Sequence, residues 1–160
     1  MRKTEFNKII AIFLILCSVA CVFGIMNGID DLNRSKITYD ELKYREYIFV
    51  SYEIDDNHKG GDKFYISVEG KAETLFVSEL LTPHKYDDFE ALQAGDKLYC
   101  YVYEDDGIIR VSEIKADKMI ISLDEYNEIY RKNGVELIII MSCLFMVSIA
   151  GAVVLSKKAK

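Results

Sequence analysis

A run of 21 residues near the end of the chain, from Val135 to Leu155, constrains this sequence more than any other feature. It contains one charged residue, Glu136, close to its start. A helix that rises 1.5 Å per residue reaches about 31 Å over this length, which matches the hydrocarbon thickness of a bilayer. Lipid satisfies no backbone hydrogen bonds, so a segment that crosses it must be helical. We therefore predict a transmembrane helix over residues 134–155.

A second apolar run, Ile9 to Ile29, follows the basic leader of residues 1–8. One interpretation is a signal peptide, because Ser18-Val19-Ala20 fits the small-x-small pattern of a cleavage site. A lipoprotein site at Cys21 fits less well, since Ser18 stands where a bulky aliphatic residue is usual. Apolarity continues beyond both sites and gives the run a full spanning length. We favour an uncleaved transmembrane helix over residues 9–29, and the sequence alone leaves cleavage open.

Charge is distributed unevenly along the chain. Residues 1–8 and 156–160 hold six basic residues and one acid, Glu5, whereas Asp30 to Asn133 holds fourteen basic and twenty-four acidic residues, a net charge of −10. Basic residues beside a span stay on the cytoplasmic side. We expect a two-pass protein of the cell membrane, with both basic ends cytoplasmic and the central domain extracytoplasmic. Its acidic charge repels phosphate backbones, so nucleic acid is not an expected partner.

The segment between the two runs has room for one small domain. Residues 30–44 are mostly polar, and we expect them to form a connector. Alternation of apolar and polar residues then predicts strands at about 45–55, 64–69, 73–78, 97–104 and 108–114, with a brief sixth at 118–121. A loop over 55–62 joins the first two strands, and Asp105-Asp106-Gly107 is typical of a hairpin turn.

Two helices are expected within the domain. Thr82-Pro83 is a typical helix start, and Gly95 is a typical stop, so we predict a helix over residues 83–94. Ser122 and Glu125 have capping-box spacing and open a second helix that runs towards Asn133.

Three strands, one helix and two strands is the element order of a five-stranded OB-like barrel, which the chain resembles at the level of fold alone. We predict two transmembrane helices flanking a small mainly-β domain over residues 45–133, built as an OB-like barrel with a C-terminal helix. A small α+β sheet with the first helix packed on one face is the alternative.

Four cysteines are present, and only Cys100 lies outside the apolar runs. It has no partner within its own domain, so a disulfide framework is not expected. Cys100 alternates with Tyr99 and Tyr101 along the fourth strand and shares a side with Leu98 and Val102. We expect a buried core residue; an intermolecular disulfide is the alternative.

Small residues form one face of the first span. They recur at offsets of four, three and four, as residues on one side of a helix do, and include a small-xxx-small pair. The second span has a comparable patch. We predict that the two spans pack through these faces, while another membrane protein would use the same surface. The residues are Cys17, Cys21, Gly24 and Gly28 in the first span and Ser148, Gly151 and Ala152 in the second.

Candidates for chemistry are few. His58 and His84 lack a Cys or His at metal-ligand spacing, and the loop after Asp55 fails as a calcium hand because Ile66 stands where a bidentate glutamate is required. Runs of adjacent acids, at residues 87–90 and 104–106, are typical of solvated turns and helix faces. No nucleophile or phosphate-loop motif is present. We expect no catalytic residues, no metal and no cofactor.

Tyrosines offer the one candidate ligand surface. Tyr99, Tyr101 and Tyr103 share one side of the fourth strand, and Tyr47, Phe49 and Tyr65 lie on the corresponding side of the first hairpin. An exposed aromatic surface of this kind would stack on an envelope glycan or peptide. The alternative is that these tyrosines pack on a second layer formed by the terminal helix, with Tyr126 and Tyr130, or rest on the membrane interface.

These features predict a non-enzymatic, membrane-anchored module outside the cytoplasm that binds a ligand or protects the envelope. The alternative is a small subunit or regulator of a membrane protein complex that acts through its transmembrane helices.

Overall fold

The computed structural model describes residues 3–55, 63–70, 74–78, 80–81, 85–105 and 107–158. The chain forms two compact units, one of residues 1–34 with 131–160 and the other of residues 35–130. Some predicted features lie outside the described residues. They are the loop that contains His58, the Thr82-Pro83 helix start with the adjacent His84, and Asp106.

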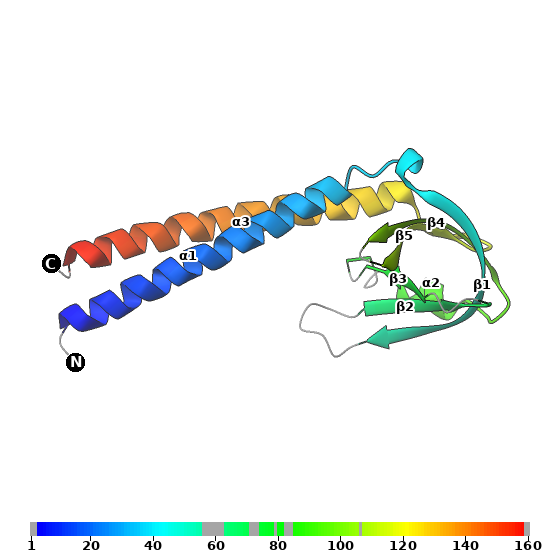
Figure 1. Ribbon diagram of the computed structural model, residues 1–160, viewed down its shortest axis with the longest axis horizontal. Coiled ribbons are helices and arrows are strands. Elements are labelled where there is room, and N and C mark those ends of the chain that lie inside the picture. The colour runs from blue at the N-terminus through cyan, green and yellow to red at the C-terminus, as the bar shows by residue number, and fades with distance from the viewer. Residues whose placement is uncertain are drawn as a thin grey trace. The chain divides into compact units, whose positions relative to one another are not determined.

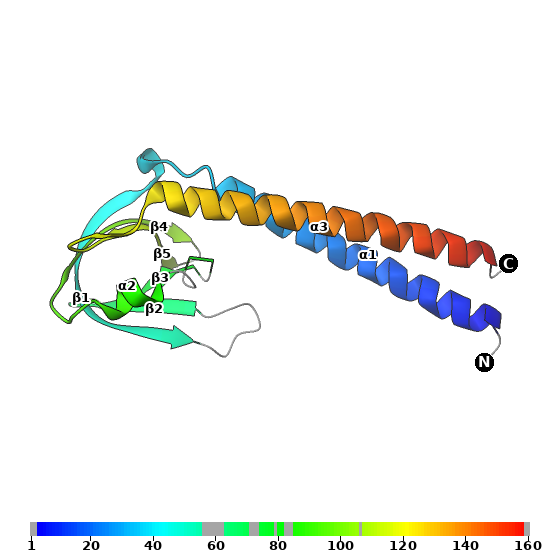
Figure 2. The ribbon, with the colours of Figure 1, turned by 180° about the vertical axis from the view of Figure 1, so that it is seen from behind.

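The first unit is a pair of long helices, α1 (Lys3–Arg34) and the greater part of α3 (Leu123–Lys158). They lie side by side and antiparallel, with the start of α1 and the end of α3 at the same end of the pair (Figures 1 and 2). α1 extends past the apolar run into the residues expected to form the connector. α3 covers the predicted terminal helix and the second span without interruption.

Both helices are long and apolar enough to cross a membrane. Most of their large apolar side chains point away from the partner helix; Phe13 is 63% exposed and Val147 is 69% exposed. Such surfaces are costly in water and favourable in hydrocarbon. A lipid bilayer is therefore the partner that the two helices fit.

Glycines set the closest approach between the helices. A Cβ atom on Gly28 would lie 2.9 Å from the carbonyl oxygen of Gly134, and one on Gly134 would lie 2.6 Å from that of Gly28. Gly24 faces Met141 in the same way, with 2.6 Å to its Cγ, and Gly151 faces Leu14. Backbone meets backbone at the Gly28–Gly134 crossing, so a larger residue on either helix would force the pair apart.

The second unit holds a six-stranded sheet, which is antiparallel apart from one parallel contact. The strand order is β3-β2-β1-β4-β5-β6, and an additional parallel pairing between β3 and β5 closes a ring of five strands. With its helical elements the unit is of the α+β class. The strands are β1 (Lys43–Asp55), β2 (Lys63–Val68), β3 (Thr74–Val77), β4 (Lys97–Asp105), β5 (Ile108–Lys115) and β6 (Met119–Ile121), and the short helices are η1 (Tyr39–Glu41) and α2 (Tyr86–Glu90).

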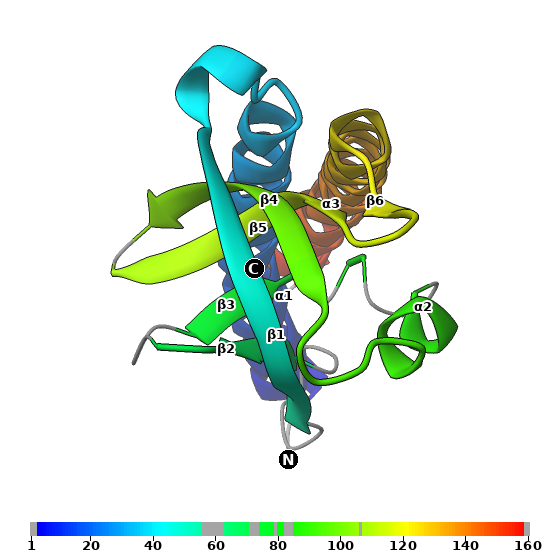
Figure 3. The ribbon, with the colours of Figure 1, turned by 90° about the vertical axis from the view of Figure 1, so that its right-hand side faces the viewer.

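β1 is the strand on which the ring depends. Its first half, residues 43–48, pairs with β4, and its second half, residues 49–55, pairs with β2. Figure 3 shows β1 crossing the view, with β4 and β5 towards one end and β2 and β3 towards the other. A bulge between Phe49 and Ser51 marks the change of partner. Bulges bend and twist a strand, so one long strand serves both halves of the ring.

The bulge corrects the predicted face of this strand. Tyr47 and Phe49, expected on the exposed side, are 5% and 3% exposed, while Val50 and Ile54 are 45% and 37% exposed. A bulge adds one residue to a strand and interrupts its alternation. Simple alternation therefore gave the wrong side before the bulge, whereas beyond it Tyr52 packs on the core as predicted, with its ring 5.0 Å from that of Phe64.

β2 and β4 bury the side that alternation predicts, whereas β3 and β5 bury consecutive residues. Phe64 and Ile66 of β2 are fully buried, as are Leu98 and Cys100 of β4, which confirms that Cys100 is a core residue. Burial alone raises the pKa of the Cys100 thiol to about 12. A protonated thiol inside the core is a poor nucleophile and is not accessible for an intermolecular disulfide.

α2 is shorter than the predicted helix. It ends at Glu90, because the chain turns before Gly95, with Asp96 Oδ2 accepting a hydrogen bond from the Gln93 amide at 2.8 Å. Phe89 is fully buried, and its ring lies 4.4 Å from that of Phe64. α2 thus packs an aromatic residue into the core of the ring.

Replacing Gly28 with leucine should weaken the helix pair by about 1–3 kcal/mol, since the new side chain overlaps Ile138 and the Gly134 carbonyl. Thermal unfolding of the full chain in detergent micelles measures the loss. Ala20→Leu is the matched control, because Ala20 is exposed on the same helix. Equal stability of the two variants would contradict this packing.

Candidate functional site

The five tyrosines expected to form a ligand surface do not share one environment. Tyr47 is buried in the core, and the other four are half-buried. Tyr65 lies on β2, whereas Tyr99, Tyr101 and Tyr103 lie on β4. Their contacts divide them further.

Tyr101 packs beneath the segment that precedes β1. Its ring lies 4.8 Å from that of Tyr39 in an edge-on arrangement and 5.4 Å from that of Tyr44. Contacts of this kind are favourable beyond the area they bury. The Tyr101 ring is therefore engaged in contacts within the protein, with Tyr39 and Tyr44.

Tyr103 contacts the first turns of α3. Its hydroxyl lies 3.0 Å from that of Tyr126, whose ring packs at 4.6 Å on that of Tyr130. The Tyr130 hydroxyl in turn donates to Ser78 Oγ at 2.7 Å. Tyr126 and Tyr130 are almost fully buried. The contacts of Tyr103 are therefore those of the second-layer alternative.

Glu113 holds the same layer together from β5. Its Oε2 atom accepts hydrogen bonds from the Tyr39 hydroxyl at 2.7 Å and from the Leu123 amide at 3.1 Å. Leu123 is the first residue of α3, where an acceptor satisfies an amide that has no partner within the helix. The hydrogen bond to Glu113, more than desolvation, raises the pKa of Tyr39 to about 12.

A cleft opens where the ends of several strands meet. It has a volume of about 400 Å³ and takes residues from all five strands of the ring and from the β4–β5 turn. The lining residues are Arg45, Tyr65, Thr74, Glu104, Gly107, Ile108 and Ile109. A guanidinium, a carboxylate, a phenol ring and a hydroxyl thus surround one space.

A row of side chains continues from the cleft across the closing strands. Tyr65 pairs with Phe76, and Phe76 pairs with Arg110, in the strand register. The Tyr65 and Phe76 rings lie 5.5 Å apart, and the Arg110 guanidinium lies 5.0 Å from the centre of the Phe76 ring. Asp105 forms an ion pair with Arg110 Nε at 2.8 Å. These contacts fix the position of Tyr65 at the wall of the cleft.

Sequence reasoning found Tyr65 but missed Arg45, Thr74 and Glu104. Each belongs to a different strand, and only the pairing of β1, β3 and β4 around the ring brings them together. In the sequence Glu104 belongs to an acidic run, residues 104–106, which is typical of a solvated turn. No local pattern in the sequence carries this arrangement.

A second cleft, of about 490 Å³, lies beside the first half of β1. It is lined by Glu46, Tyr47, Ile48, Glu69, Gly70 and Lys97. Tyr47, the one aromatic residue among them, is almost completely buried. This cleft offers charged groups without an accessible ring, so the first cleft is the better candidate for a ligand with mixed chemistry.

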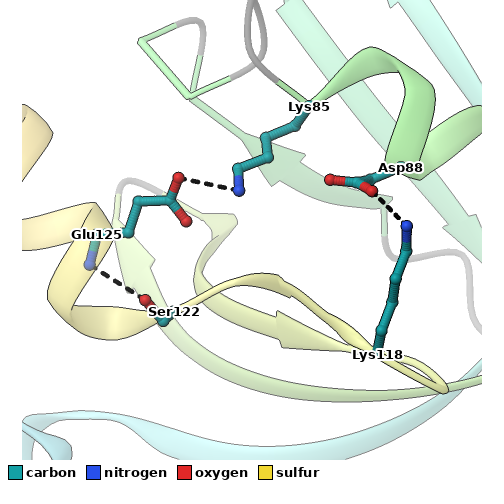
Figure 4. Close-up of polar contacts among 5 residues, drawn as sticks. All are labelled: Lys85, Asp88, Lys118, Ser122 and Glu125. Carbon is teal, nitrogen blue, oxygen red and sulfur yellow. Dashed lines mark hydrogen bonds and ion pairs between the residues drawn. The ribbon is translucent and has the colours of Figure 1, made fainter.

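Polar contacts at the side of the sheet fasten α2 to its neighbours (Figure 4). Lys85 forms an ion pair with Glu125 of α3 at 2.9 Å, and Lys118 forms one with Asp88 at 2.6 Å. The Glu125 amide donates to Ser122 Oγ at 3.2 Å, which is the serine half of the expected capping box. The Lys118 hydrogen bond lowers the pKa of Asp88. An acid that stays ionised does not serve as a proton donor at neutral pH.

The small-residue positions lie along the helix pair. Cys21, Ser148 and Ala152 are 6%, 8% and 5% exposed, and Cys17 is half-buried. Gly24, Gly28 and Gly151 also lie where the two helices face each other. All seven predicted packing residues therefore lie on the less exposed sides of α1 and α3. The Ser18 hydroxyl, also buried, donates to the Leu14 carbonyl at 2.9 Å.

Comparison with protein-family models, curated proteins and solved structures finds no match for this chain. Within the described residues, no group of three or more His, Cys, Asp and Glu side chains is placed to hold a metal ion.

Stability should fall between about pH 10 and pH 12 as Tyr39 ionises. Its pKa is about 12 in the folded chain and 10.0 in the unfolded chain, so the stabilisation is complete below pH 10 and is lost as pH rises through 12. Tyr39→Phe should lower stability at pH 8 and flatten the alkaline slope. Chemical unfolding at pH 8 to 12 measures both effects, with Tyr99→Phe as control. An unchanged slope in Tyr39→Phe would contradict the Tyr39–Glu113 contact.

Proposed function

We propose that this protein is a non-enzymatic binding module, held at a membrane by α1 and α3, whose ligand occupies the cleft between Arg45 and Glu104. The observation that carries the proposal is the convergence of opposite charges, an aromatic ring and a hydroxyl in one space of about 400 Å³. Ligand sites combine apolar surface with a few placed polar groups in this manner.

The connectivity of the sheet supports the same proposal. The ring runs β1-β2-β3-β5-β4 and returns to β1, with α2 between β3 and β4 in the chain. We infer a small barrel of the OB type, in which ligands bind across the second and third strands and the neighbouring loops. The cleft takes Tyr65 from β2, Thr74 from β3 and Gly107 from the β4–β5 turn, so it lies in that region.

A short peptide with both charges is the ligand that this chemistry favours. Arg45 complements a carboxylate, Glu104 complements an ammonium or guanidinium group, and Tyr65 offers a ring for an apolar side chain. Anionic polymers are disfavoured by Glu104 and by the net charge of −10 over residues 30–133. An uncharged glycan is the competing outcome of the test below.

The basic ends of the chain support the orientation. Lys157 and Lys158 lie in the last turn of α3, and Lys8 lies near the start of α1. Basic residues beside a span remain in the cytoplasm, so we propose that the sheet unit faces the extracytoplasmic side. There it would meet peptides of the envelope and take part in binding or protection.

The alternative, a subunit that joins a complex through its transmembrane helices, has less support. Its predicted contact surface includes Gly24 and Gly28, and both already pack against α3 of the same chain. A partner would have to use the outward apolar faces, which fit lipid equally well. The cleft therefore remains the better basis for a function.

Arg45→Gln and Tyr65→Ala should each weaken peptide binding about tenfold or more, because each removes one principal group of the cleft. The full chain in detergent micelles is titrated with a library of labelled tetrapeptides, and fluorescence anisotropy reports binding. Lys97→Gln and Tyr99→Ala are matched controls that alter the second cleft and the outside of β4. Loss of binding in the controls as well, or binding of neutral oligosaccharides in place of peptides, would contradict the proposal.

A further inference from the structure

A groove lies between α1 and α3 near the basic ends of the chain. It has a volume of about 360 Å³, and most of its lining is apolar. Ile15 of α1 and Ile149 and Val153 of α3 line it and are 50%, 39% and 47% exposed, while Ala152 is 5% exposed and lies at its base. Small Ala152 thus leaves a channel bordered by larger side chains along the outside of the helix pair.

One end of this groove is polar and positively charged. Ser156 and Lys157 complete its lining in the last turn of α3. The two helices are antiparallel, and their register follows from two contacts, Gly24 with Met141 and Leu14 with Gly151. A step of ten residues towards the start of α1 thus matches a step of ten residues towards the end of α3. Continuing this register places Lys8 of α1 at the level of Lys157 of α3. Two lysines therefore occur at the depth where the groove reaches the end of the apolar segment.

We propose that this groove binds one anionic phospholipid, with an acyl chain along Ile15, Ile149 and Val153 and the headgroup phosphate at Lys157. Charge complementarity selects this occupant. Residues 1–8 and 156–160 hold six basic residues against one acid, and each basic residue near a membrane surface attracts anionic lipid. The apolar lining requires a hydrocarbon chain, which a free phosphate ion does not supply.

The position of the charge distinguishes this site from the general lipid surface of the helices. Within the apolar runs of α1 and α3 many exposed side chains are large and apolar, such as Phe23 and Val147. Those surfaces select no particular headgroup. The groove, in contrast, is an apolar channel for one acyl chain that ends at the Lys157 ammonium group. It can therefore contact the acyl chain and the headgroup of the same lipid molecule.

The test measures lipid binding to the full chain in a neutral detergent by native mass spectrometry. Phosphatidylglycerol and phosphatidylcholine with identical acyl chains are compared. We expect phosphatidylglycerol to bind about fivefold more tightly for each lysine that contacts its phosphate. Lys157→Gln should remove about fivefold of that preference. Lys158→Gln, the same change one residue further round the helix, should leave it intact.

A second pair of variants tests the acyl-chain channel. Val153→Phe fills the groove and should weaken both lipids, whereas Val154→Phe, about 100° further round the helix, should weaken neither. Circular dichroism checks that both variants keep their helix content. If Val153→Phe fails to fold, the comparison of Lys157→Gln with Lys158→Gln still tests the site.

Three results would overturn the proposal. Equal affinity for the two lipids would exclude headgroup selection. An equal loss in Lys157→Gln and Lys158→Gln would show a diffuse attraction with no defined site. Displacement of the lipid by soluble glycerol phosphate would show that the headgroup binds without the groove.

Discussion

The inability of lipid to hydrogen-bond a peptide group is the constraint on which this structure depends. Every backbone amide inside the bilayer must find its partner within its own segment, which makes both apolar runs helical. Two helices that cross together have little hydrophobic reason to associate, so close packing must hold them. The backbone contact between Gly28 and Gly134 supplies that packing, and it fixes the register that places the basic residues of α1 and α3 at one level.

Much of this fold is present in local sequence patterns. The six strands and the serine cap at Ser122 follow from alternation, turn residues and capping spacing. A helix before β4 was also expected, but α2 begins after Lys85 and is shorter than the predicted segment. Which side chains of β1 face the core does not follow from alternation, because the bulge after Phe49 reverses which residues point inward. The β3–β5 pairing that closes the ring joins strands far apart in the chain, and no local pattern specifies it.

The candidate site shows the same division. Tyrosines on alternate positions of β4 were expected to form one surface, but Tyr101 packs on Tyr39 and Tyr103 on Tyr126. Their layer is stabilised by Glu113, which accepts one hydrogen bond from Tyr39 and another from the start of α3. The cleft that remains accessible combines Arg45, Tyr65 and Glu104, which come together only when the ring forms. Composition reveals such residues, but their proximity depends on tertiary pairing.

Amide hydrogen–deuterium exchange of the full chain in lipid nanodiscs tests the central claim most directly. Amides of residues 9–29 and 135–155 should show almost no exchange over hours, because lipid excludes water from two complete helices. Exchange there at the rate of a water-exposed helix, or a mature chain that lacks residues 1–20, would contradict the account.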